Sequence, residues 1–103
     1  MGTAERETIF AFLLREVAAG PANTMSTGAE LVVHGTTIAK REGDRIFLTL
    51  AGFPSKLTRK RLNTLLDAMG SPKKFWQEQG RQYFGNPTGY FQNVEADQWV
   101  VIQ

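Results

Sequence analysis

An amphipathic segment in the middle of the chain limits the folds open to this protein. Four apolar residues recur at helical spacing and form one stripe: Leu62, Leu65, Leu66 and Met69. Thr58 is a suitable N-cap, Leu57 before it can pack on the stripe, and Gly70 is placed to end the helix. We therefore expect a helix over residues 59–69 that must cover its stripe with a sheet.

Strand-like segments lie on both sides of this helix. They are predicted at residues 30–34, 37–41, 45–50, 73–78, 81–84 and 98–102. The turn at Glu42–Asp44 indicates a hairpin, and Ile46, Leu48 and Leu50 share the face that should meet the helix. The sequence thus predicts an α+β fold, in which an antiparallel sheet packs on one central helix and Leu62, Leu65 and Leu66 are core residues.

The N-terminal third has a different organisation. Residues 3–19 read as a helix, with a broad apolar face made by Ile9, Phe10, Leu13, Leu14 and Val17. Residues 20–28 are small, polar and aperiodic, so we expect a loop, followed by the α+β body over residues 29–103. A chain of 103 residues suits one domain. The N-terminal helix could dock on this body or on a second copy, so a homodimer is compatible with the sequence.

Residues 71–84 allow two interpretations. Ser71 and Pro72 could begin a second helix. The favoured alternative is a hairpin around Gln79-Gly80, because aromatic residues typical of strands flank that turn on both sides.

Composition excludes several kinds of site. The chain has no cysteine and one histidine, so neither a disulfide nor a Cys-rich or His-rich metal site is expected. We read His34 as a structural residue at a strand end, and residues 85–89 as a plain turn. No catalytic motif and no cofactor-binding motif is present, which predicts a protein that is not an enzyme. No apolar run approaches the roughly 20 residues of a membrane helix, so we expect a soluble protein of the cytoplasm.

Charge is distributed unevenly along the chain. The net charge is +2 overall, but residues 40–81 carry ten basic and four acidic groups, and both flanking regions are acidic. Three cations crowd the start of the central helix, where its dipole disfavours them. Either this is a solvated polar surface or it is a contact site for an anion or an acidic partner. The candidate partner-binding residues are Lys56, Arg59, Lys60, Arg61, Lys73, Lys74 and Arg81.

Aromatic residues stand beside two of these basic groups. Phe75 and Trp76 follow Lys73-Lys74, while Tyr83 and Phe84 follow Arg81. Such rings can stack on bases next to phosphate-binding cations, but they are more often core residues.

The middle of the chain resembles an uncharacterised family of short phage and prophage proteins. The resemblance covers roughly residues 35–84 and rests on two short motifs. Its residues here are Gly35, Thr36, Ile38 and Ala39 in a strand, and Thr58, Arg61, Leu62 and Asn63 in the helix. Leu57 stands where the family pattern has a threonine. The resemblance implies a small accessory protein of a mobile element, a class that includes anti-CRISPR proteins and other inhibitors of host defence.

Two functions of different class follow from these observations. The favoured one is a phage-encoded inhibitor that binds a host protein or ribonucleoprotein complex without catalysis. The alternative is a phage accessory or regulatory protein that binds nucleic acid through the same basic residues. The modest net charge of +2 favours the protein partner.

Overall fold

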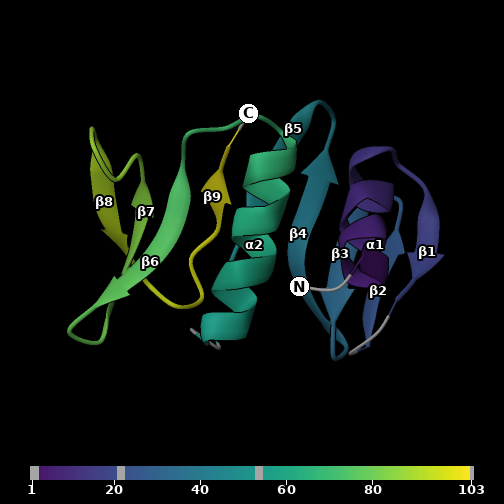
Figure 1. The fold of residues 1–103 in the computed structure, drawn as a ribbon, viewed down its shortest axis with the longest axis horizontal. Coiled ribbons are helices and arrows are strands. Elements are labelled where there is room, and N and C mark those ends of the chain that lie inside the picture. Colours follow the sequence, from purple (N-terminus) through teal and green to yellow (C-terminus); the bar gives the residue numbers. More distant parts are fainter. Residues whose placement is uncertain (1–2, 21–22, 53–54, 103) are drawn as a thin grey trace.

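The computed structural model describes residues 3–20, 23–52 and 55–102, which form two helices and nine strands (Figure 1). The elements in chain order are α1 (Thr3–Leu13), β1 (Val17–Ala19), β2 (Thr24–Thr27), β3 (Glu30–Val33), β4 (Thr36–Glu42), β5 (Arg45–Leu48), α2 (Lys56–Ala68), β6 (Lys74–Glu78), β7 (Arg81–Gly85), β8 (Phe91–Val94) and β9 (Val100–Val101).

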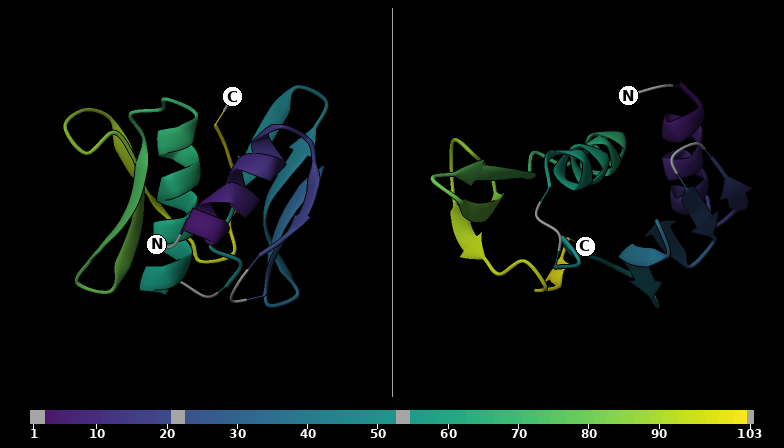
Figure 2. Two further views of the ribbon diagram at one scale, coloured as in Figure 1. Left: turned by 45° about the vertical axis from the view of Figure 1, so that its right-hand side comes forward. Right: turned by 90° about the horizontal axis from the view of Figure 1, so that it is seen from below.

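The strands form two antiparallel sheets. The larger has the order β1-β2-β3-β4-β5-β9, and the smaller has the order β6-β7-β8. Seen from below, the two sheets bend around α2, and both helices lie on the same side of the large sheet (Figure 2). The predicted α+β class is confirmed. The strands expected in one sheet are nevertheless divided between two, with the C-terminal strand β9 paired to β5.

Tight turns with positive φ close the predicted hairpins. Gly43 (φ 61°) lies between β4 and β5, and Gln79 (φ 51°) and Gly80 (φ 79°) lie between β6 and β7. Two successive residues with positive φ make the turn that matches the twist of paired strands. The hairpin interpretation of residues 71–84 is therefore confirmed, since Phe75 pairs with Phe84 and Trp76 with Tyr83.

Helix α2 occupies the predicted place but begins earlier. Its N-cap is Ser55, whose Oγ accepts a hydrogen bond from the Thr58 backbone N–H at 3.1 Å, so Thr58 is a helical residue and not the cap. Gly70, with φ 71°, follows the end of the helix as expected. Leu62, Leu65 and Leu66 are fully buried, which confirms the apolar stripe.

Helix α1 is shorter than predicted and buries a different face. It ends at Leu13, and the chain then turns at Arg15, which has φ 59°. Ile9 and Phe12 are fully buried, whereas Leu14 and Val17 are 68% and 79% exposed. Because the helix stops at Leu13, Leu14 and Val17 no longer follow its periodicity. The predicted apolar face is wrong at these two positions and also at Phe10, which is 40% exposed within the helix.

The predicted loop over residues 20–28 contains a strand. Thr24 and Ser26 of β2 point into the molecule, where they are 1% and 0% exposed, and Ser26 Oγ donates to the Glu16 carbonyl at 2.7 Å. Hydrophobic periodicity could not reveal a strand whose buried residues carry hydroxyl groups. Residues 21 and 22 of this loop lie outside the described part.

Arg41 joins α1 to the large sheet. Its Nη1 donates to the carbonyls of Phe12 (3.2 Å) and Gly28 (2.9 Å), and its guanidinium lies 4.8 Å from the centre of the Phe12 ring. Burial, and secondly the charge of Arg15, lower the pKa of Arg41 from its ordinary value. The N-terminal helix is therefore docked on its own chain by a partly desolvated cation at its C-terminal end.

Candidate contact surface

The aromatic residues of the small sheet divide between its two faces. Phe75 and Phe84 point into the core, where they are 3% and 4% exposed and their ring centroids lie 4.6 Å apart. Trp76 and Tyr83 are their neighbours in sequence, so period-2 alternation places them on the opposite face. The sequence left open whether these aromatics are core or contact residues, and the structure buries Phe75 and Phe84 but leaves Trp76 and Tyr83 partly exposed.

Three rings gather on the outer face of the small sheet. Trp76 stacks on Tyr83 at a centroid distance of 5.8 Å, and Phe91 from β8 meets both edge-on at 5.2 and 5.9 Å. Phe91 is 46% exposed, and its neighbour Tyr90 is 87% exposed. We call Trp76, Tyr83 and Phe91 the aromatic face. Such a cluster of large rings at the surface is typical of an interaction site.

Two grooves flank the aromatic face at Trp76. One, of about 470 Å³, runs between α2 and β6 and is lined by Lys56, Lys60 and Thr64 together with Trp76. The other, of about 460 Å³, is lined by Lys74, Glu78, Pro87 and Phe91 as well as Trp76. The first groove brings three of the predicted basic residues, Lys56, Arg59 and Lys60, beside the aromatic face, together with the carboxylate of Asp67.

Arg59 is held in place beneath this surface. Its Nη1 donates to Gln77 Oε1 at 3.0 Å and to Gln82 Oε1 at 3.1 Å, and Gln82 Nε2 donates to Gln77 Oε1 at 2.8 Å. Gln82 is only 6% exposed. Arg59 therefore links the start of α2 to the inner side of the β6–β7 hairpin.

The other predicted cations have separate surroundings. Lys74 Nζ forms an ion pair with Asp67, and Lys73 Nζ lies 5.8 Å from the centre of the Phe84 ring. Arg81 is exposed at the end of the hairpin, where its backbone pairs with Glu78. These cations are thus distributed around the small sheet rather than gathered into one patch.

Arg61 does not belong to the exposed surface. It is only 2% exposed and lies in the wall of a cavity beside the β3–β4 turn. His34, at that turn, has φ 51° and accompanies Gly35 with φ 76°. Of the four cations predicted to form one contact site at the helix start, Arg61 is therefore the one that is buried, because its position on α2 faces the large sheet.

Phe91 and strand β8 were not predicted from the sequence. The strand follows the turn at residues 85–89 directly, and three of its four residues are exposed, so it lacks an apolar alternation. The adjacent Tyr90-Phe91 pair was the only available signal.

Neither a membrane-spanning helix nor a metal-binding cluster is found among the residues that the structure describes. No helix there is long and apolar enough to cross a membrane. No group of three or more His, Cys, Asp or Glu residues in the same ranges is arranged to hold a metal ion.

A family of known proteins matches most of the chain. The model of the family described as Kyanoviridae Gp96 protein matches residues 16–100. No curated protein matches the chain, and no solved structure does.

Proposed function

Because the chain belongs to the Kyanoviridae Gp96 family of phage accessory proteins, we propose that it acts by binding a host protein or ribonucleoprotein complex. The aromatic face is the observation that carries this proposal. Tyr and Trp are enriched among the residues that dominate binding energy in protein interfaces. In this proposal Trp76, Tyr83 and Phe91 are the anchors, and Lys56 and Lys60 contribute charge at the rim of the adjacent groove.

The phage origin of the family supports a more specific role. A small phage protein that binds without catalysis can inhibit a host defence complex by covering its working surface, as an anti-CRISPR protein does. The protein would then act in the cytoplasm of the infected cell. We propose this role, with no catalytic step and no cofactor, as the function of the aromatic face.

A nucleic-acid-binding role is the second candidate. It is favoured by Lys56 and Lys60, which share a groove with Trp76, since stacking rings beside cations suit a single strand. Against it, Arg61 is buried and Lys74 pairs with Asp67, so fewer cations are placed to meet phosphates. We therefore rank the protein partner first.

A tagged pull-down from the host, run beside gel-shift assays at low salt, separates the two candidates. A protein-directed inhibitor leaves bare single- and double-stranded probes unshifted and recovers a host complex, whose defence activity falls when purified protein is added. A nucleic-acid binder shifts the probes, and each phosphate-contacting Lys or Arg that is removed lowers the slope of log K against log salt by about 1. Tight probe binding without a recovered host complex would reverse our ranking.

A further inference from the structure

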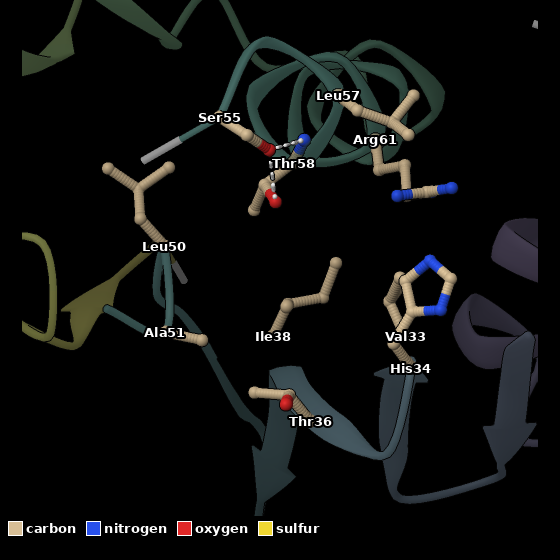
Figure 3. Close-up of a pocket in the computed structure, with 10 residues that line it drawn as sticks. All are labelled: Val33, His34, Thr36, Ile38, Leu50, Ala51, Ser55, Leu57, Thr58 and Arg61. Carbon is tan, nitrogen blue, oxygen red and sulfur yellow. Dashed lines mark hydrogen bonds between the residues drawn. The ribbon is translucent and has the colours of Figure 1, made fainter. Parts of the chain in front are cut away.

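A cavity of about 430 Å³ opens between the large sheet and the start of α2 (Figure 3). Its residues differ from those that line the two grooves beside the aromatic face. Its volume falls within the roughly 300–1,000 Å³ that is usual for small-molecule sites. The cavity is therefore a candidate small-molecule site that is separate from the aromatic face.

The walls of the cavity are largely aliphatic. Val33 and Ile38 from the β3–β4 hairpin and Leu50 after β5 are 7%, 3% and 1% exposed. Leu57, on the first turn of α2, is 47% exposed and stands at the rim. These walls suit a short apolar chain, which would leave water on entering.

The polar groups of the cavity carry positive charge or hydroxyls. Arg61 extends from α2 into the space opposite the His34 ring, and the Ser55 and Thr58 side chains lie along the helix side (Figure 3). Acidic side chains are absent from the described lining. A guanidinium presents a rigid fork of N–H donors that matches a carboxylate, and its attraction for an anion is stronger in a buried wall than in water.

We propose that this cavity binds a small organic acid with a short aliphatic chain. The carboxylate lies toward Arg61, and the chain lies against Val33, Ile38 and Leu50. An amine of the same length is disfavoured by Arg61, and a neutral alcohol gains only the apolar contacts. A specific site therefore requires both the carboxylate and the aliphatic chain of its ligand, whereas a nonspecific apolar cavity requires only the chain.

The test uses the ¹⁵N-labelled full chain, titrated with hexanoate, hexanol and hexylammonium while amide shifts are recorded. We expect saturable shifts at Val33, His34 and Thr58 with hexanoate. An additional charge-assisted contact predicts at least about tenfold weaker binding of hexanol, and hexylammonium should bind more weakly still. Absence of saturable shifts at these amides, or equal affinity for hexanoate and hexanol, would overturn the proposal.

Replacing the buried Arg61 could unfold the protein, so the test uses the variant Leu57→Asp at the exposed rim. A carboxylate at the rim repels the ligand, and an acidic residue in the first turn of a helix is compatible with folding. Lys56→Gln lowers the net charge by the same amount, but Lys56 lines the groove between α2 and β6 and not this cavity. We expect at least about a tenfold loss of hexanoate affinity in Leu57→Asp and less than about a twofold loss in Lys56→Gln. Equal losses in the two variants would also overturn the proposal.

Discussion

Three consecutive residues of α2, Arg61, Leu62 and Asn63, make three different contacts. Arg61 lies buried beside the large sheet, and Leu62 is fully buried in the core. Asn63 Nδ2 donates to the Phe75 carbonyl at 2.9 Å, and its Oδ1 accepts from the Phe75 N–H at 2.7 Å. Asn63 thus pairs with the backbone of Phe75 at the free edge of β6. This segment, which the sequence analysis identified as a motif, joins α2 to both sheets.

Replacing Asn63 tests that connection. Asn63→Ala leaves the N–H and carbonyl of Phe75 without their protein partner, so we expect a loss of about 1–3 kcal/mol in the free energy of unfolding. Thr64→Ala is the matched control, because Thr64 Oγ1 donates to the Lys60 carbonyl within the same helix, and its effect should stay within about 0.5 kcal/mol. Urea denaturation measures both. Similar effects in the two variants would contradict the proposed role of Asn63.

Leu65 tests the apolar stripe itself. It is 0% exposed, so Leu65→Ala removes buried methyl groups and leaves a cavity, for which we expect a loss of about 2–5 kcal/mol. Leu57→Ala is the control, because Leu57 is 47% exposed on the same helix. An unchanged urea midpoint for Leu65→Ala would show that the stripe does not face the core.

At the scale of whole elements, the predictable strands are those closed by short turns. Gly43 and Gly80 mark hairpins that the sequence shows directly, because glycine readily supplies positive φ. Strand β2 was missed because its buried side chains are Thr24 and Ser26, and β8 because it buries only Val94. The start of α2 was misplaced by three residues because Ser55 and Thr58 both carry a hydroxyl suited to capping. The local sequence thus predicted the presence of helices and strands better than it predicted the residues at which they begin.

Strand β8 depends on a close approach at Gly85. This residue has φ 144°, and a Cβ placed there would lie 2.5 Å from the Phe91 Cα and 2.6 Å from the Tyr90 carbonyl oxygen. Both are backbone atoms, so β8 must shift to accommodate any side chain. The position of Phe91 in the aromatic face therefore requires glycine at position 85.

Gly85→Ala should displace β8 and separate Phe91 from Trp76. We expect a lower urea midpoint and a changed Trp fluorescence spectrum, since the 5.2 Å contact between these rings would be lost. Gly89→Ala is the control, because the atoms nearest to a Cβ there belong to the Asn86 side chain, at 3.4 Å or more, which is ordinary van der Waals contact. Native fluorescence and stability in Gly85→Ala would show that β8 does not require this close approach.

At the scale of the molecule, α2 lies between the two sheets and contributes to two surfaces (Figure 1). Lys56 and Lys60 line the groove beside the aromatic face, while Leu57 and Arg61 line the aliphatic cavity. The division of the strands into two sheets was not predictable, because it depends on β9 pairing with β5 across the chain. The sequence predicted Lys56, Lys60 and Arg61 as candidate contact residues. Only the structure shows that Lys56 and Lys60 lie near the aromatic face and that Arg61 is buried.

We propose that the aromatic face is the surface that binds the host partner. The most direct test is a tagged pull-down that compares how much host complex the Trp76→Ala and Trp99→Ala variants recover. Urea denaturation first confirms that both variants are folded. Trp99 is a matched control, since it is 38% exposed and lies against Lys40 (4.4 Å from Nζ to the ring centre), outside the small sheet. We predict that Trp76→Ala weakens binding at least about tenfold, as loss of an interface anchor does, and that Trp99→Ala changes it by less than about twofold. Undiminished recovery by Trp76→Ala, or an equal loss in both variants, would contradict the account.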